Sequence, residues 1–188
     1  MAISTPVAST QTQTRSTWKI DASHSLVEFS VRHMMVSTVK GRFAEVQGTI
    51  VDVADDPTQS SVEVSIPAAS ITTSDPQRDG HLRSPDFFDA EQYPTITFKS
   101  RRIEGSRDKF TLVGDLTIRG VTREVGMKVE FNGVGTSPYG KTVAGFSAET
   151  KLNRKDWGLN WNVALETGGV LVSDQIKLSL EIEAVRED

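Results

Sequence analysis

The chain has 188 residues, a formal net charge of −4, 37% hydrophobic residues and no cysteine. This length fits one domain whose core needs no disulfide, and the lack of cysteine excludes thiol catalysis and cysteine metal sites. The acidic balance without a basic run argues against nucleic-acid binding. No run of about 18 apolar residues predicts a membrane span. Because residues 1–16 lack the basic and apolar segments of a secretory signal, we expect a cytoplasmic location, with the periplasm as the alternative.

The predicted strands begin after a short tail. Residues 1–16 are rich in Ser, Thr and Gln and have almost no bulky apolar groups, so they predict a disordered N-terminal tail. Residues 17–188 then form one predicted domain. A first strand is predicted at residues 18–21. Residues 34–40 are predicted to form a turn region, and residues 41–53 one long strand that needs a bulge or a bend.

Alternation of apolar and polar residues dominates most of the chain. Val27, Phe29 and Val31 share one face of a predicted strand, and residues 176–183 show the cleanest alternation. This period of two is typical of strands with one dry face and one wet face. About eight such strands, joined mostly by short turns, predict an all-β fold, and glycines inside long strands favour a barrel over a sandwich. A barrel of this size is either filled by side chains or holds one slender ligand.

Residues 70–94 interrupt the strand pattern with a long insertion. Asp75 followed by Pro76 is a helix-start signal, whereas Gly80 disfavours a long helix, so we expect short turns here. An insertion of this length in a small all-β domain is typical of a lid, a plug or a binding loop. We expect it to close one end of the barrel.

Charged and aromatic side chains crowd this insertion. Arg78, Asp79 and Arg83 suit an acid–base or anion-binding group, but the favoured interpretation is a structural ion pair that fastens the insertion to the barrel rim. Phe87 and Phe88 are interpreted as a plug. A plug at the mouth of a ligand-binding barrel would also contact the ligand, so these two roles stay open together.

Known catalytic motifs are missing from the sequence, including the nucleophile elbow, the phosphate-binding loop and the His-Glu-x-x-His zinc motif. His24, His33 and His81 lie in separate segments, so only folding could assemble them into a metal site. We interpret His24 and His33 as residues that border strands and His81 as a hydrogen-bonding group within the insertion. No catalytic residue and no metal ligand is therefore predicted.

A series of short motifs runs through residues 17–185. Each motif is weak by itself, and their order and spacing make the set specific. The motifs are Trp18-x-Ile20-Asp21-x-x-His24-Ser25, Phe29-x-Val31-x-His33, Gly41-x-Phe43, Ser70-Ile71-x-Thr73, Arg78-Asp79-x-His81-Leu82, Asp86-Phe87-Phe88-Asp89, Tyr93-Pro94-x-Ile96-x-Phe98-x-Ser100, Gly114-x-Leu116-Thr117-Ile118-x-Gly120-Val121-Thr122 and Arg154-x-Asp156-Trp157-Gly158. Together they resemble the YceI-like family of lipocalin-like proteins, with Trp157 in place of the more usual Phe.

The resemblance implies an eight-stranded antiparallel lipocalin-like β-barrel that holds a long-chain amphiphilic lipid, most simply a polyisoprenoid or an isoprenoid quinone. The implied role is carriage, storage or sequestration, with no cofactor besides this lipid, and a homodimer is an oligomeric state that the resemblance allows. A fatty-acid or fatty-amide binding protein is the first alternative. An enzyme that acts on an isoprenoid chain through His81 and Asp79, and a solid-cored interaction protein without a ligand, are the others.

Alternation and the resemblance together predict which side chains contact the lipid. Phe87 and Trp157 are predicted at the mouth of the barrel. Inward-facing residues from several strands are predicted to form its wall. These wall residues are Val27, Phe29, Val31, Phe98, Leu112, Leu116, Val129, Phe146, Ile176, Leu178 and Leu180.

Overall fold

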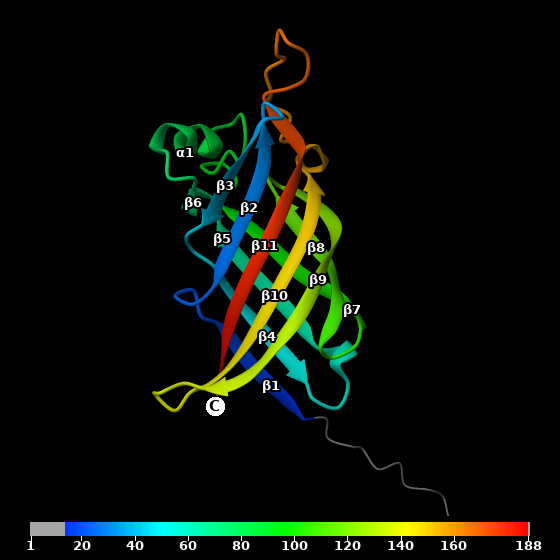
Figure 1. The fold of residues 1–188 in the computed structure, drawn as a ribbon. Helices are drawn as coiled ribbons and strands as arrows, with labels where there is room; N and C mark the ends of the chain where they lie inside the picture. Colours follow the sequence, from blue (N-terminus) through cyan, green and yellow to red (C-terminus); the bar gives the residue numbers. More distant parts are fainter. Residues whose placement is uncertain (1–13, 188) are drawn as a thin grey trace, which may run out of the picture.

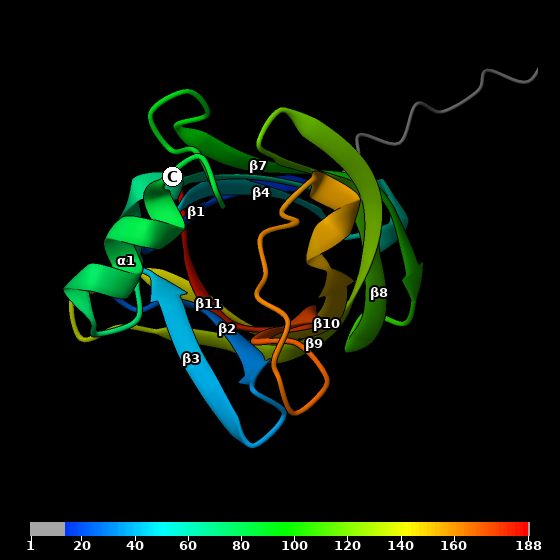
Figure 2. The same ribbon diagram turned by 90° about the horizontal axis from the view of Figure 1, so that it is seen from above.

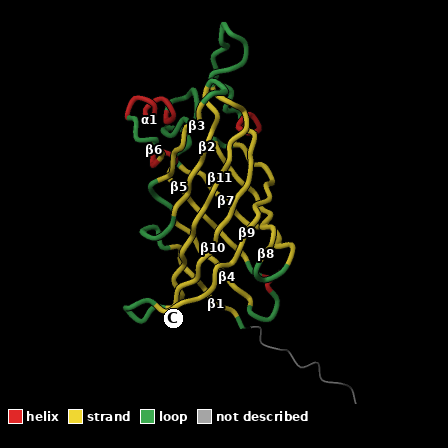
Figure 3. The backbone as a smooth tube through the Cα atoms, viewed as in Figure 1, coloured by secondary structure: helices red, strands yellow, loops and turns green. Residues whose placement is uncertain are grey.

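A single antiparallel sheet closes on itself in the computed structural model, which describes residues 14–187 (Figures 1 and 3). Eight strands form the ring, because the eighth strand in the pairing order also pairs with the first strand. In that order they are β1 (Arg15–Ile20), β4 (Gln47–Val53), β5 (Ser61–Pro67), β7 (Thr95–Gly105), β8 (Lys109–Ile118), β9 (Val121–Thr136), β10 (Thr142–Asn153) and β11 (Val172–Arg186). The predicted eight-stranded barrel is confirmed.

Three further strands continue the sheet beyond β1, toward one end of the barrel. β2 (Leu26–His33) pairs with the same edge of β11 as β1 does, β3 (Ser37–Phe43) pairs with β2, and β6 (Ile71–Thr72) pairs with β3. Because β1 and β2 share one neighbour, they occupy one position in the barrel wall, interrupted by a turn. The three short 3-10 helices are η1 (Pro57–Gln59), η2 (Ala68–Ser70) and η3 (Arg154–Trp157).

The predicted insertion contains the one α-helix of the described residues, α1 (Pro76–Arg83), which lies beside β3 and β6 (Figures 1 and 2). Asp75 caps it as expected, since its carboxylate accepts hydrogen bonds from the backbone N–H groups of Gln77 and Arg78. The helix is a little longer than the short turns that we predicted. Within residues 14–187, no helix has both the length and the apolar character needed to cross a membrane.

Two boundaries near the N-terminus differ from the prediction. β1 begins at Arg15, so the predicted disordered tail was wrong at residues 14–16: residues 15–16 pair with β4, and the Thr14 carbonyl accepts a hydrogen bond from Ala54 N–H. The rest of that prediction, at residues 1–13, lies outside the described residues. Pairing explains the difference, because the ladder between β1 and β4 runs without a break from Lys19 to Arg15.

The predicted turn at residues 34–40 is confirmed at residues 34–36 and was wrong at residues 37–40, because β3 already begins at Ser37. The connection is a tight turn with Met34 and Met35 at φ 50° and 61°, a geometry usually signalled by Asn-Gly. The predicted single strand 41–53 is divided into β3 and β4. The chain leaves the ladder between them, where Ala44 N–H donates to the Ser70 carbonyl and Val46 is only 4% exposed.

The barrel has two different ends. The end that carries α1, the β2–β3 turn and the β8–β9 turn is called the plugged end here, at the top of Figure 1. The end that carries the β4–β5, β7–β8 and β9–β10 connections is called the open end. The largest cluster of buried residues joins strand residues such as Leu112 and Val125 to Phe87, Trp157 and Leu159, which come from connections at the plugged end.

Candidate functional site

An apolar cavity lies inside the barrel in the half next to the open end. Its volume is about 390 Å³, within the roughly 300–1,000 Å³ typical of ligand sites. Exposed Thr58 and Ser106, from the connections at the open end, belong to its lining. Val134 also lines the cavity and is 58% exposed. The cavity therefore reaches the surface at the open end and is bounded on the other side by the packed core.

The structure divides the predicted wall residues into two groups. One group lines the cavity and combines residues from β2, β7, β8, β9, β10 and β11. Alternation identified these residues correctly as inward-facing, because every second residue of each strand points into the barrel. The predicted residues that line the cavity are Val27, Phe98, Leu112, Val129, Phe146 and Leu180.

The second group lies outside this cavity. Phe29 and Val31 pair with Leu178 and Ile176, directly beyond the Val27–Leu180 pair that lines the cavity. By the same alternation these side chains point inward, but nearer the plugged end, where they are half-buried. Leu116 packs against both main core clusters. Whether any of these residues touches a ligand stays a prediction.

The predicted position of the mouth was wrong, because Phe87 and Trp157 lie at the opposite end from the opening. Trp157 is 2% exposed and donates its Nε1–H to the Leu116 carbonyl at 3.0 Å. Phe87 is 7% exposed, and its ring lies 5.3 Å from that of Trp161. These aromatic side chains, together with Leu159, form the plug of the barrel. Sequence reasoning identified the plug but not the end at which the cavity opens.

A buried arginine holds one side of the plug. Arg154, 5% exposed, donates hydrogen bonds to the carbonyl oxygens of Leu159, Trp161 and Ser173. Burial lowers the pKa of its guanidinium, against the opposing charge of Asp174. Arg154 therefore ties the segment that supplies Leu159 and Trp161 to the first residues of β11.

The carboxylate of Asp79 fastens the other side of the plug. Asp79 is 6% exposed and accepts hydrogen bonds from Thr73 N at 2.7 Å, Thr73 Oγ1 at 2.6 Å and Thr72 Oγ1 at 3.1 Å. Burial acts to raise the pKa of this carboxyl, but the hydrogen bonds from Thr73 and Thr72 and the charge of Arg83 outweigh it, so the pKa is lowered. Asp79 is thus held as a carboxylate that links α1 to the strand before it.

The two arginines of α1 complete this fastening through backbone contacts. Arg83 donates to the carbonyl oxygens of Ala69 and Ile71, each at 2.8 Å, and Arg78 donates to Thr73 Oγ1 and to the Thr73 carbonyl. The fastening role is as predicted, but the expected ion pair among Arg78, Asp79 and Arg83 was wrong. Within residues 14–187, neither arginine lies within ion-pair distance of Asp79, and Arg78 pairs instead with Asp75, Nη1 to Oδ2 at 3.8 Å.

The histidines do not converge. His81 Nε2 lies 2.8 Å from Asp86 Oδ2, within the insertion as predicted, and its ring packs edge-on against Phe87 and Trp161. His24 contacts Asp21 at the end of β1, and His33 ends β2. Because Asp79 bonds Thr73 while His81 bonds Asp86, these two groups do not form the acid–base pair that the enzyme alternative requires.

One ion pair marks the mouth of the cavity. Asp52 and Arg107 are the only charged residues among those that line it within the described chain, and Arg107 Nη2 lies 3.4 Å from Asp52 Oδ2. Arg107 Nη1 also donates to the Ala54 carbonyl at 3.0 Å. The guanidinium therefore reaches from the β7–β8 connection across to the end of β4. With the Asp52 carboxylate and the serine and threonine hydroxyl groups of the lining, it supplies the polar atoms at this end of the cavity.

Sequence reasoning missed part of the lining. The signal was present for several of them in the alternation of residues 62–66, 110–116 and 125–131, but at these positions it was used to place strands and not to assign a wall. The polar rim carried no sequence signal, since Asp52 and Arg107 lie far apart in the chain. The apolar residues missed include Ile20, Ile50, Val62, Val64, Phe110 and Met127.

Comparison with known proteins gives consistent matches over the barrel. The family model of the YceI-like domain matches residues 18–184. The UPF0312 protein SAS2572 of Staphylococcus aureus strain MSSA476 is 40% identical over 165 residues, which cover 87% of this chain and 94% of that protein.

Solved structures show the same fold. The Campylobacter jejuni YceI protein superimposes with a TM-score of 0.72 at 31% identity, covering 84% of this chain and 90% of that chain. A polyisoprenoid binding domain from Saccharophagus degradans gives a TM-score of 0.69 over 93% of this chain and 99% of that chain, and at 13% identity this likeness concerns the fold alone. The match of residues 18–184 and the 40% identical relative show that the chain belongs to the YceI-like family.

Proposed function

We propose that this protein binds the apolar chain of an amphiphilic lipid in the cavity at the open end, with the lipid head group at the Asp52–Arg107 rim. The observation that carries the proposal is the enclosed apolar lumen with a single ion pair at its mouth. A polyisoprenoid or an isoprenoid quinone is the proposed ligand. The polyisoprenoid-binding domain that shares the fold supports this choice.

The cavity volume limits how much of a chain it holds. At roughly 30 Å³ for each heavy atom, as for water in the liquid, a cavity of about 390 Å³ holds about thirteen atoms. Burial of that many methylene groups contributes roughly 10 kcal/mol, at about 0.8 kcal/mol for each group, before the cost of association. This is enough for stable binding. With its head group at the rim, a chain that ends inside the cavity can have only about this many atoms, so a long polyisoprenoid fits in this orientation only if the plug moves.

A binding role accounts for the polar groups better than a reaction does. The buried carboxylate of Asp79 and the buried guanidinium of Arg154 are occupied in holding the plug. Neither lines the cavity. We therefore propose carriage, storage or sequestration of the lipid, with catalysis on an isoprenoid chain as the lesser alternative.

Extraction of the purified protein with organic solvent, followed by mass spectrometry of the extract, tests the ligand. We expect an isoprenoid alcohol or quinone in stoichiometric amount. If fatty acids or fatty amides are found in that amount, the proposed class of ligand is wrong and the binding role still holds. Repeated extracts without any lipid, from protein expressed in several hosts, would count against the binding role.

A further inference from the structure

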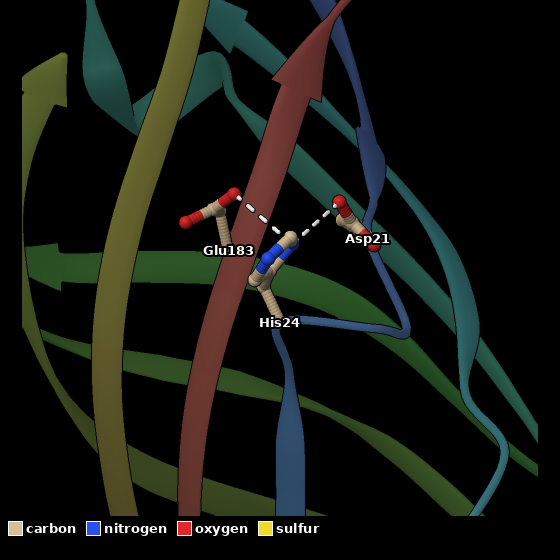
Figure 4. Close-up of side chains that lie close together, drawn as sticks. All are labelled: Asp21, His24 and Glu183. Atoms are coloured by element: carbon tan, nitrogen blue, oxygen red, sulfur yellow. Dashed lines mark hydrogen bonds and ion pairs between the residues drawn. The ribbon is translucent and has the colours of Figure 1, made fainter. Parts of the chain in front are cut away.

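A group of metal-ligating side chains lies on the outer surface of the barrel, away from the lipid cavity. Figure 4 shows His24 between Asp21, which follows β1, and Glu183 on β11. His24 Nδ1 lies 3.0 Å from Asp21 Oδ2 and 3.7 Å from Glu183 Oε1. All three ligand atoms lie within 4.8 Å of one another. Tetrahedral coordination with bonds of about 2.0–2.2 Å places ligand atoms about 3.3–3.6 Å apart, so the two distances from His24 are already close to this spacing, and the carboxylate oxygens need to approach each other by about 1 Å at most.

Backbone hydrogen bonds join the three residues and hold them close together. Asp21 N–H donates to the Glu183 carbonyl at 2.8 Å, and Glu183 N–H donates to Ser25 Oγ at 3.1 Å. His24 N–H donates to the Asp21 carbonyl, closing the turn between β1 and β2. The interruption of the barrel wall between β1 and β2 is thus what presents an imidazole to two carboxylates.

Hydrogen bonds from Ser23 also orient the carboxylate of Asp21. Its Oδ1 accepts hydrogen bonds from Ser23 N at 2.9 Å and Ser23 Oγ at 2.6 Å, which leaves Oδ2 directed toward His24. Ligating carboxylates in metal sites are typically oriented by such outer hydrogen bonds.

The charge around this group differs from that around several other strand carboxylates. Glu63 and Glu149, for example, have lysine partners across the sheet, Lys99 and Lys177. Among the described residues, neither Asp21 nor Glu183 has a Lys or Arg within ion-pair distance, and the His24 imidazole lies within that distance of both. The two carboxylates beside the imidazole therefore have no permanently positive side chain within ion-pair distance to balance their charge.

From this geometry we propose that Asp21, His24 and Glu183 form a surface site for a divalent transition-metal ion of the Zn²⁺ class. Water completes the coordination on the exposed side. One imidazole nitrogen with two carboxylate oxygens suits Zn²⁺ and its neighbours, whereas Mg²⁺ and Ca²⁺ prefer an all-oxygen set. A bound ion joins the turn after β1 to β11 and closes the interruption in the barrel wall.

Titration of the untagged full-length protein with zinc sulfate in a non-chelating buffer, followed by calorimetry, tests the proposal. We expect one Zn²⁺ per chain and binding of Mg²⁺ at least tenfold weaker. His24→Asn and Glu183→Gln should each weaken Zn²⁺ binding by about tenfold or more. His81→Gln is the matched control, because it removes the other imidazole–carboxylate contact, to Asp86, and it should leave the affinity within about twofold.

Nuclear magnetic resonance of the wild-type protein gives a readout that needs no variant. Addition of Zn²⁺ should shift the ring signals of His24 and leave those of His81 and His33 unchanged. The proposal is overturned if wild-type protein binds no Zn²⁺, if His24→Asn binds it as tightly as wild type, or if the His81 signals respond in place of those of His24.

Discussion

The two ends of this barrel are built from the same alternating strands, yet only one of them leaves space for a ligand. At the plugged end, Phe87, Trp157 and Leu159 enter the lumen from connections and join the buried core. At the open end, the connections contribute short polar residues such as Ser106 and Thr58, and the inward-facing strand residues are left around a cavity. The difference therefore arises in the connections and not in the strands.

The two ends also use their polar groups differently. At the plugged end, Asp79 and Arg154 are buried and bonded to hydroxyl and backbone groups. At the open end, Asp52 and Arg107 form a partly exposed pair at the rim. Buried hydrogen-bonded charges are costly to disrupt, whereas exposed pairs contribute little. Substitutions at the plugged end should therefore affect mainly stability, and those at the open end mainly ligand retention.

Removal of the plug should have the largest effect. Trp157→Ala is expected to lower the free energy of unfolding by about 3–5 kcal/mol, because it opens a cavity in the packed core and removes the hydrogen bond to Leu116. Chemical denaturation measures this change. Tyr139→Ala, at a residue that is 90% exposed, should change stability by less than about 0.5 kcal/mol. Equal effects of the two variants would contradict the assignment of Trp157 to the plug.

Loss of the Asp79 carboxylate should have the next largest effect on stability. Asp79→Asn keeps the size of the side chain but removes the charge that accepts hydrogen bonds from Thr73 and Thr72. Because hydrogen bonds to a charged group contribute about 1.5–3 kcal/mol, we expect a loss of about 2 kcal/mol in the free energy of unfolding at neutral pH.

The pH dependence of that loss gives a sharper test. The pKa of Asp79 is lowered in the folded protein below the ordinary value of 3.8. Its stabilising contribution is therefore fully present above that value and is lost as the pH falls through the lower, folded-state pKa. The stability difference between wild type and Asp79→Asn should shrink as the pH falls below about 4. A difference that stays constant down to pH values near 2 would show that the charge is not the cause.

Neighbouring inward-facing residues of one strand should separate the two halves of the lumen. Leu180 lines the cavity and Leu178 does not, although both point inward from β11. We expect Leu180→Trp to fill part of the cavity and to lower the amount of co-purified lipid about tenfold, which corresponds to about 1.4 kcal/mol. Leu178→Trp should retain lipid as wild type does. Mass spectrometry of extracts from both folded variants measures this, and equal losses would mean that the ligand occupies the whole lumen.

Disruption of the rim pair should have the smallest effect on stability. Arg107→Ala should cost less than about 1 kcal/mol but should speed release of bound lipid to acceptor vesicles, because the guanidinium crosses the mouth. Arg101→Ala is the control, since Arg101 pairs with Asp115 and does not line the cavity. Identical release rates for the two variants would show that Arg107 does not control lipid release at the mouth of the cavity.

Local sequence patterns predicted which strand residues face into the barrel better than they predicted which part of the barrel is filled. Period-two alternation placed Val27 and Leu180 inside correctly, and the Asp75–Pro76 signal marked the start of α1. Which inward-facing residues meet empty space depends on where Phe87 and Trp157 pack, and they pack against strand residues such as Leu112 that are distant from them in sequence. No periodicity records that long-range contact, so the plug was recognised and the position of the mouth was not.

The tight turn at Met34 and Met35 shows a second limit. Both residues adopt positive φ, for which Gly and Asn are the usual signals. Pairing of Ser37–Phe43 with β2 imposes the turn in spite of its residues. Tertiary pairing outweighed local preference there, and this is why the boundary of β3 was misplaced.

Electron density in a crystal structure of the protein with its co-purified lipid tests the central claim most directly. The account predicts continuous density that begins at the rim between Asp52 and Arg107, runs past Val129 and Leu180, and ends against the core around Phe98. Density among Phe29, Val31 and Leu178 at the plugged end, with the open-end cavity empty, would contradict it.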